Sequence, residues 1–192
     1  MTVKQVFSAY DHQQLPGEQE GHFRFCPHCG GQLQLRQIAG RERSCCMACG
    51  FIQFRNPLPA VAVMVTDRDR ILLGRRRNEL EEDRWCMPCG FIEHDEDFLT
   101  AARREVKEET GLDIRPVELI NVAFNFLTPT IHTLVPVIRA EVLGGSLQAD
   151  DDMAEVGWFG PEDPLPPLAF ESDMYIIDRY RRGLVQPMPV EG

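Results

Sequence analysis

Residues 90–112 read GFIEHDEDFLTAARREVKEETGL, a glycine followed by an acidic helical pattern. Residues 97–110 are predicted to form a helix that Gly111 closes at a C-cap position. Successive helical residues turn by about 100°, so Glu105, Glu108 and Glu109 share one face. Apolar side chains occupy the adjoining arc: Phe98, Leu99, Ala102 and Val106. One flank of the helix is therefore expected to pack on a sheet while the acidic arc faces a cleft.

The clustered carboxylates predict a bound cation. Like charges at this spacing destabilise a helix, so three of them together favour an ion that neutralises them. An all-oxygen ligand set selects a hard ion, Mg²⁺ or Mn²⁺. Such ions assist the cleavage of phosphate anhydrides, which makes pyrophosphate hydrolysis the natural reaction. From the helix alone, the alternative is a solvated acidic face without chemical meaning.

The cysteines predict a second metal site. Of seven in the chain, four form two Cys-x-x-Cys-Gly turns: Cys26, Cys29, Cys46 and Cys49. Sixteen residues separate the two pairs, a spacing typical of a zinc ribbon. Four thiolates complete tetrahedral Zn²⁺, so we expect a structural site whose folding depends on the metal. The alternative is two unrelated pairs of buried or free thiols, with Cys45 as an adjacent spare.

The chain divides into one main domain and a small appendage. Residues 1–20 have the composition of a flexible tail, residues 21–55 form the zinc ribbon, and Pro57 and Pro59 mark a boundary. The main domain is expected over residues 56–183, followed by a C-terminal tail over 184–192.

The main domain is predicted to be α+β. Apolar runs predict strands at 60–65, 71–73, 117–126 and 133–142, the first two forming a hairpin. Helices are expected at 97–110 and 172–182. A mixed or antiparallel sheet packed against helices is the expected architecture.

Composition limits the partners. No stretch approaches the roughly 18 apolar residues of a membrane span, and the paired cysteines suit a reducing compartment, so we expect a cytoplasmic protein. The net charge of −10 argues against nucleic acid. Four arginines do lie near the zinc ligands: Arg24, Arg36, Arg41 and Arg43. Without an aromatic ladder beside them, a scaffold or dimer surface is the favoured role for the ribbon.

The spacing of the first segment resembles a known motif. Gly90-x5-Glu96-x7-Arg104-Glu105-Val106-x-Glu108-Glu109-x-Gly111-Leu112 matches the Nudix box of the Nudix hydrolases at every fixed position. With the cysteines, the chain is similar to the zinc-ribbon subgroup that includes ADP-ribose and FAD pyrophosphatases. The resemblance implies an α/β/α sandwich with a mixed sheet, often homodimeric, that hydrolyses a small nucleoside diphosphate linked to another moiety, X.

The resemblance also implies roles for individual residues. Glu105, Glu108 and Glu109 correspond to the catalytic metal ligands, with Gly90 and Glu93 as additions on the substrate side. Arg104 corresponds to the residue that orients the loop and the ligands through Glu96. Glu155, in the acidic loop 150–155, corresponds to a variable carboxylate that binds metal or acts as base.

Two positions depart from the usual pattern. Asp95 stands where a glycine usually precedes the first box glutamate, and Asp tolerates the left-handed geometry of that turn. Cys89 replaces the usual small residue before Gly90 and forms a third Cys-x-x-Cys pair with Cys86. Packed thiols are favoured there over a redox or second zinc role.

The identity of X rests on weaker signals. No array like that of the NADH-pyrophosphatase branch lies between residues 113 and 136, whereas Pro129 and the 168–170 segment resemble the ADP-ribose and FAD branch. Aromatics that could stack on adenine or flavin are Phe124, Phe126, Trp158 and Phe170, and packing in the core is the alternative role for most of them. We therefore expect ADP-ribose or FAD to be cleaved to AMP and phosphorylated X. The alternatives are NADH pyrophosphatase, a non-catalytic nucleotide sensor and a nucleic-acid adaptor.

Overall fold

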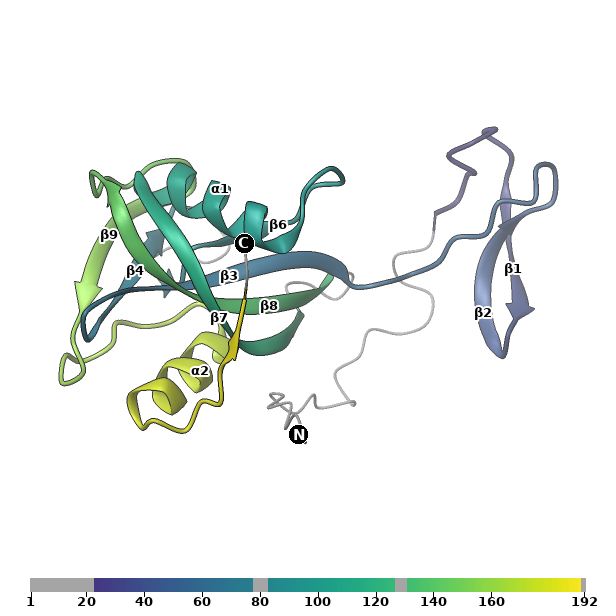
Figure 1. Ribbon diagram of the computed structural model, residues 1–192. Helices are drawn as coiled ribbons and strands as arrows, with labels where there is room; N and C mark the ends of the chain where they lie inside the picture. Colours follow the sequence, from purple (N-terminus) through teal and green to yellow (C-terminus); the bar gives the residue numbers. More distant parts are fainter. Residues whose placement is uncertain (1–22, 78–82, 127–130, 191–192) are drawn as a thin grey trace. The chain divides into compact units, whose positions relative to one another are not determined.

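A computed structural model describes residues 23–77, 83–126 and 131–190, which fall into two compact units (Figure 1). The larger unit is a sheet between two helices, and the smaller contains a two-stranded hairpin. The tail expected over residues 1–20 lies outside the described residues. No helix in the described ranges is long and apolar enough to cross a membrane.

The larger unit is built on an eight-stranded sheet whose main path runs β10-β7-β8-β3-β4-β5. Its strands are β3 (Leu58–Asp67), β4 (Arg70–Arg76), β5 (Trp85–Cys86), β6 (Cys89–Phe91), β7 (Leu112–Phe126), β8 (His132–Gly145), β9 (Met153–Phe159) and β10 (Met188–Pro189). Strand β6 pairs with β3, and β9 pairs with β4. Strands β3 and β8 are parallel, whereas β4 and β6 run antiparallel to β3, so the sheet is mixed.

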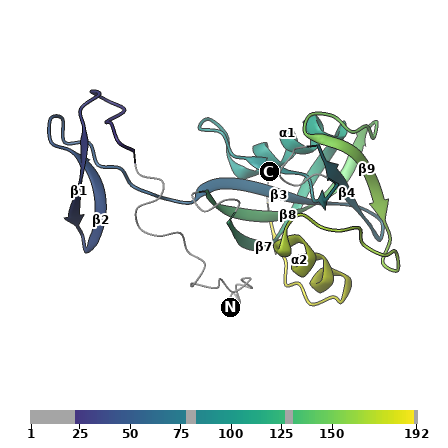
Figure 2. The same cartoon turned by 180° about the vertical axis from the view of Figure 1, so that it is seen from behind.

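Strand β3 explains why both faces of the sheet are covered. Its residues alternate between two cores: Ala60, Ala62 and Met64 belong to one, and Val61, Val63 and Val65 to the other. The first core includes side chains of α2 (Glu171–Arg181), and the second includes side chains of α1 (Phe98–Thr110). The helices lie on opposite faces of the sheet (Figures 1 and 2). The predicted α/β/α sandwich with a mixed sheet is confirmed.

The end of the chain differs from the expected tail over residues 184–192. Met188 and Pro189 form β10, which pairs antiparallel with Leu119 and Glu118 of β7. The N–H of Val190 also donates to the carbonyl of Val117, 3.0 Å away. A two-residue strand that contains a proline gives no periodic signal, so the sequence pattern could not reveal this pairing.

The smaller unit is organised around the cysteines. Strand β1 (Leu33–Ile38) pairs antiparallel with β2 (Arg41–Cys46) through a two-residue turn at Ala39 and Gly40, whose φ values are 50° and 76°. Each Cys-x-x-Cys turn ends in a glycine with positive φ, 71° at Gly30 and 77° at Gly50. Glycine adopts this left-handed backbone at no steric cost, which lets both turns fold tightly.

Candidate active site

Helix α1 carries the acidic cluster and has well-formed ends. Asp97 is the N-cap, and its Oδ1 accepts hydrogen bonds from the N–H groups of Leu99 and Thr100 at 2.8 and 2.9 Å. Gly111 closes the helix with φ 72°, as expected, and its N–H donates to the carbonyl of Lys107. These caps fix the helix boundaries and therefore the direction in which the glutamates point.

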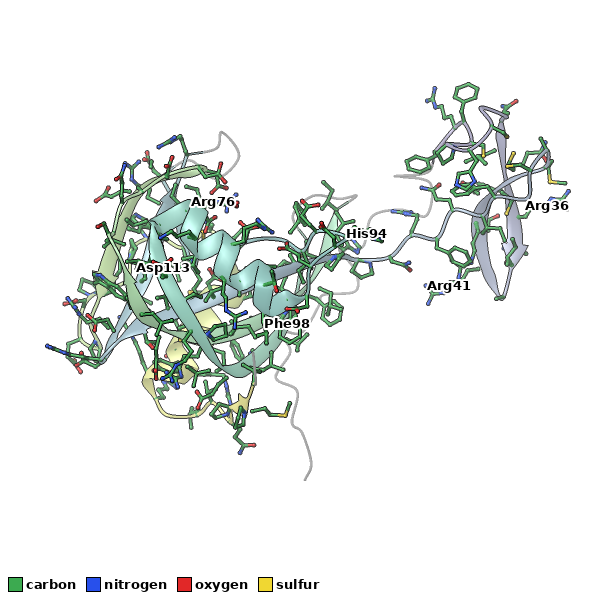
Figure 3. All side chains as sticks on the ribbon, turned by 45° about the horizontal axis from the view of Figure 1, so that its top comes forward. Arg36, Arg41, Arg76, His94, Phe98 and Asp113 are labelled. Atoms are coloured by element: carbon green, nitrogen blue, oxygen red, sulfur yellow. The ribbon has the colours of Figure 1, made fainter. Side chains whose placement is uncertain are left out.

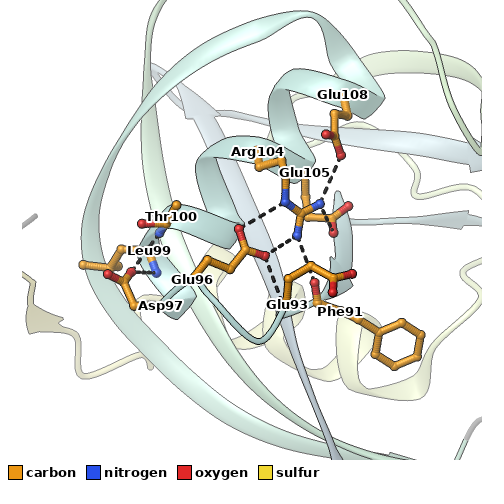
Figure 4. Close-up of polar contacts among 9 residues, drawn as sticks. All are labelled: Phe91, Glu93, Glu96, Asp97, Leu99, Thr100, Arg104, Glu105 and Glu108. Carbon is orange, nitrogen blue, oxygen red and sulfur yellow. Dashed lines mark hydrogen bonds and ion pairs between the residues drawn. The ribbon is translucent and has the colours of Figure 1, made fainter.

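Arg104 organises the residues around it (Figure 4). Its guanidinium binds both carboxylate oxygens of Glu96, and its Nη2 donates to the carbonyl of Phe91 at 3.0 Å. Its Nη1 donates to Glu105 Oε1 at 2.7 Å and to Glu108 Oε2 at 3.1 Å. The side chain of Glu96 is 9% exposed, and hydrogen bonding from Arg104 lowers its pKa. Arg104 thereby ties the loop before α1 to two glutamates of the helix.

Gly90 and Glu105 are in close contact. A Cβ built at residue 90 would lie 2.0 Å from Glu105 Oε1, so a side chain there would have to displace the Glu105 carboxylate. Gly90 pairs with Val61 of β3, which fixes the backbone of the loop beneath the carboxylate. Glu93 is exposed, and its N–H donates to Glu96 Oε1 at 3.0 Å. The structure thus brings together Gly90, Glu93, Arg104, Glu105 and Glu108.

Glu109 lies deeper than the other two glutamates. Its residue is 1% exposed, whereas the side chain of Glu108 is 48% exposed. The N–H of Cys89 donates to Glu109 Oε2 at 3.0 Å. Burial, with further contributions from Cys89 and the neighbouring Asp152, raises the pKa of Glu109 well above its ordinary value. Burial also raises the pKa of Glu105. Burial thus disfavours the charged form of both carboxyl groups unless a cation or a proton balances the charge.

Asp152 is a carboxylate of this site that the motif did not identify. It precedes β9 and lies near Glu109, and its buried Oδ1 has no hydrogen-bond partner in the described structure. The N–H of Asp150 donates to the carbonyl of Glu109 at 3.1 Å, which holds this loop against the end of α1. The run of three aspartates at 150–152 was the available signal, and the structure places Asp152 beside Glu109 and Asp151 close enough to Glu105 to contribute to its raised pKa.

Glu155 lies elsewhere than expected. It is inside β9 rather than in the loop before it, and its Oε2 accepts a hydrogen bond from Arg75 Nε at 3.2 Å. Its register partner on β4 is Arg75, and its side chain is 58% exposed. Because β9 begins at Met153, the strand places Glu155 beside an arginine of β4 and not beside Glu109.

The expected aromatic residues are dispersed. Phe170, at the N-cap of α2, lies 5.5 Å from the guanidinium of Arg76, measured to the ring centroid. Arg76 also approaches Asp152 Oδ2 at 3.5 Å, so Phe170 is connected to the acidic cluster through this arginine. Phe124 lies on β7 and is half-buried. The side chain of Phe126 and the whole of Pro129 lie outside the described residues.

The four ribbon cysteines form a compact cluster. All four Sγ atoms lie within 4.8 Å of one another, with Cys26–Cys49 at 3.5 Å and Cys29–Cys46 at 3.4 Å. Backbone N–H groups, first that of Cys49, lower the pKa of Cys46 to about 6, while hydrogen bonds with neighbouring thiols of the cluster raise the pKa values of Cys29 and Cys49. Cys45 is outside this cluster, and its Sγ faces the carbonyl of Arg43. Among the described residues, these four are the only such group of three or more potential ligands.

Cys86 and Cys89 are unlike the ribbon cysteines. Both thiols are free, Cys86 is buried, and Arg76 Nη1 lies 3.7 Å from its Sγ. The hydrogen bond with the Cys86 thiol, followed by burial, raises the pKa of Cys89 well above its ordinary value. Packed thiols stay the prediction for this third pair.

Family comparisons agree with these two sites. Residues 56–180 match the family described as the NUDIX domain, and residues 24–55 match the family described as Nudix N-terminal. A crystal structure of a NUDIX hydrolase from Nitrosomonas europaea superimposes with a TM-score of 0.74 and 28% identity, covering 83% of this chain and 91% of that one.

Two curated relatives have named activities. The NAD-capped RNA hydrolase NudC of Pseudomonas aeruginosa is 31% identical over 174 residues, which cover 87% of this chain and 60% of that protein. The ADP-ribose pyrophosphatase of Methanocaldococcus jannaschii is 36% identical over 130 residues, covering 65% of this chain and 76% of that protein. The chain therefore spans only about 60% of the length of the NAD-capped RNA hydrolase.

Proposed function

Because this chain belongs to the Nudix hydrolase family, we propose that it is a metal-dependent pyrophosphohydrolase that cleaves the diphosphate of ADP linked to X. ADP-ribose and FAD are the first candidates, and the products are AMP and phosphorylated X. The observation that carries the proposal is the arrangement of Glu105, Glu108 and Glu109 on one side of α1 beside Gly90 and Arg104.

The donor set suits a divalent cation because it consists of carboxylate oxygens. Among the described residues, these oxygens are spaced more widely than the cysteine sulfurs and form no group of three within 4.8 Å. Burial raises the pKa of Glu105 and Glu109, and the buried Oδ1 of Asp152 accepts no hydrogen bond in the described structure, so a divalent cation would satisfy groups that are costly to bury alone. Glu105, Glu108, Glu109 and Asp152 would hold Mg²⁺ or Mn²⁺ together with the carbonyl of Gly90. When bound, the ion would offset charge on the phosphates and acidify a water.

Other residues of the chain position this ligand set. Arg104 holds the carboxylates of Glu105 and Glu108 from one side and Glu96 from the other, which restricts their rotamers. The N–H of Cys89 orients Glu109. Asp152 is a better candidate than Glu155 for the variable carboxylate that binds metal or accepts a proton, because it lies next to Glu109.

The relatives support two candidate substrates of the form ADP-X. The resemblance to an ADP-ribose pyrophosphatase favours ADP-ribose. The match to an NAD-capped RNA hydrolase, which extends over 87% of this chain, adds a nicotinamide dinucleotide as a candidate after ADP-ribose and FAD. Phe170, beneath the Arg76 guanidinium and close to the acidic cluster, is the aromatic side chain best situated to contact a base.

We propose that the ribbon cysteines hold one structural Zn²⁺. Four thiolates at mutual distances within 4.8 Å suit a tetrahedral ion and leave no position for a substrate. A homodimer and a cytoplasmic location stay predictions.

One panel of substrates tests the proposal. The purified protein would be given ADP-ribose, FAD, NADH, an NAD-capped short RNA and GTP in Mg²⁺ or Mn²⁺, and the release of mononucleotide would be measured. We expect an ADP-X compound to be cleaved fastest, with loss of turnover in Glu109→Gln. Hydrolysis of GTP a hundredfold faster would indicate a different substrate class, and tight ADP-ribose binding without turnover in either metal would indicate a sensor.

A further inference from the structure

The charge of the chain is unevenly distributed. Residues 24–55 contain five arginines and one glutamate, a formal charge of +4, although the whole chain carries −10. The remainder therefore carries −14. Zn²⁺ held by four thiolates adds about −2, so the ribbon stays positive with the metal bound. The overall charge, which argued against nucleic acid, averages two regions of opposite sign.

Three of these arginines share one face of the hairpin. Arg36 and Arg43 are register partners on β1 and β2, and residues directly opposite in an antiparallel pair project to the same side. Arg41 lies two residues from Arg43 and projects to that side as well. Figure 3 labels Arg36 and Arg41 on this hairpin. We call the surface formed by Arg36, Arg41, Arg43, Gln34 and Phe54 the basic face.

Within the described part of the chain, the arginines of the basic face form no ion pair with an acidic side chain. Among the residues that the structure describes, every ion pair joins two residues of the segment from 67 to 182, and none includes a residue of the ribbon. Like charges directly opposite on neighbouring strands destabilise the pairing, so Arg36 facing Arg43 costs stability. The buried Nε of Arg43 also has no hydrogen-bond partner in the described structure. An anion bound on the exposed side of the hairpin would supply the missing acidic partner and offset the repulsion between Arg36 and Arg43.

An exposed aromatic ring completes the basic face. Residues 51–54 run beside β2, since Ile52 bridges to Cys45 and the N–H of Gln53 donates to the carbonyl of Ser44. The ring of Phe54 lies 4.7 Å from the guanidinium carbon of Arg43 and is 58% exposed. A phenyl ring held in place by an arginine, with its surface open to water, offers a platform on which an unpaired base stacks.

We propose that the basic face of the ribbon binds single-stranded RNA. Guanidinium groups pair with successive phosphates, and Phe54 takes one base by stacking, an arrangement that requires the base to be unpaired. The exposed amide of Gln34 projects to the same side and can bond a 2′-hydroxyl, the group that distinguishes RNA from DNA. The basic face contains no member of the acidic cluster on α1, so this activity is separate from the proposed hydrolysis.

Binding is tested without hydrolysis. The probe is a fluorescently labelled, unstructured 12-nucleotide RNA with a 5′-hydroxyl, which contains no diphosphate, and the full chain with zinc bound is titrated at 50 and 200 mM salt. We expect the Arg36→Gln/Arg43→Gln double variant to bind at least tenfold more weakly at 50 mM salt. Loss of two single-strand phosphate contacts should reduce the slope of log affinity against log salt by about 1.4.

The matched control removes the same charge elsewhere. Arg70→Gln/Arg115→Gln also deletes two exposed guanidiniums, and each of these is paired with an acid of the sandwich. We expect RNA affinity within twofold of wild type for this variant, and unchanged zinc content in both variants. Phe54→Ala should weaken binding at both salt concentrations, whereas Leu143→Ala, another exposed apolar position, should not.

Several outcomes would overturn the proposal. These are no RNA binding at 50 mM salt, equal losses in the two double variants, or equally tight binding of poly-glutamate. Duplex RNA or single-stranded DNA binding as tightly as the single-stranded RNA would also contradict it. Because no substrate is turned over, failure here would leave the proposed hydrolysis intact, and failure of hydrolysis would leave RNA binding intact.

Discussion

The Glu105 carboxylate lies directly against the backbone of Gly90, so that a Cβ at residue 90 would overlap Oε1 at 2.0 Å. Arg104 holds the same carboxylate from the other side through a 2.7 Å hydrogen bond to Oε1. Glu105 is therefore confined between a backbone and a guanidinium, and its position depends on both.

Gly90→Ala should displace the Glu105 carboxylate. A shift of about 1 Å in a catalytic group can cost 10²-fold in rate, so we expect kcat to fall by about that factor. Gly144→Ala is the control, because nothing lies within 4 Å of a Cβ at that position. Steady-state kinetics and thermal unfolding of both variants check this. A wild-type kcat in Gly90→Ala would show that catalysis does not require the Glu105 carboxylate to lie against the backbone of residue 90.

Glu105→Gln and Glu109→Gln should each lower kcat by at least about 10²-fold, because each removes a ligand charge. The free energy of unfolding should not decrease in Glu109→Gln, since Glu109 is buried and its charged form is disfavoured in the folded protein. Lys107→Gln, an exposed position of the same helix whose Nζ pairs with Asp113, should keep its activity. Similar losses of kcat in all three variants would indicate that α1 matters only for folding.

Asp152→Asn should reduce kcat more than Glu155→Gln does. Asp152 lies beside Glu109, whereas Glu155 is paired with Arg75 on the sheet. The expected difference is at least tenfold, measured with the same substrate and at saturating Mn²⁺. A larger loss of kcat in Glu155→Gln than in Asp152→Asn would indicate that Glu155 is the carboxylate that binds metal or accepts a proton.

Asp173 should make the protein less stable as pH rises. Burial raises its pKa from 3.8 to about 7 in the folded chain. A carboxyl group whose pKa is higher in the folded than in the unfolded chain contributes its full stability at pH values below the unfolded pKa. This contribution to the free energy of unfolding is lost as pH rises from about 4 to about 7. The loss is on the order of 4 kcal/mol.

Asp173→Asn should flatten this dependence, since the amide oxygen can still accept the hydrogen bond from Met87 N–H. Urea unfolding at pH 5 and pH 8 measures the effect in both proteins. Asp178→Asn, on an exposed part of the same helix, serves as the control. The same pH dependence in wild type and Asp173→Asn would rule out Asp173 as its source.

Removal of zinc should unfold the ribbon and leave the sandwich folded. The β1–β2 hairpin belongs to neither of the two hydrophobic cores, so its folding is expected to depend on the metal. Metal analysis should find one Zn²⁺ per chain in wild type and in Cys45→Ser, and markedly less in Cys46→Ser. Hydrogen exchange after chelation should increase over residues 24–55 only.

The sequence predicted much of this fold because the relevant signals are local. The helical period and the glycine after Thr110 defined α1, and the apolar run at 60–65 defined β3. The run is apolar throughout because alternate residues of β3 enter two different cores, a burial on both faces that continuous apolar strands indicate.

Long-range features were harder to predict. Asp152 and Glu155 are three residues apart and both acidic, so only the start of β9 at Met153 decides which one approaches Glu109. Phe54 becomes part of the basic face only because residues 51–54 return beside β2. The pairing of β10 with β7 likewise joins segments about 70 residues apart, which no local pattern encodes.

The hydrogen bond from residue 89 to Glu109 has an evolutionary consequence, because its donor is the main chain. Any residue except proline supplies this N–H, so a carboxylate of the site is oriented without constraint on the side chain at position 89. A cysteine can therefore occupy position 89. Substitution there is limited by the space beside Cys86, and proline is excluded because it lacks the donating N–H.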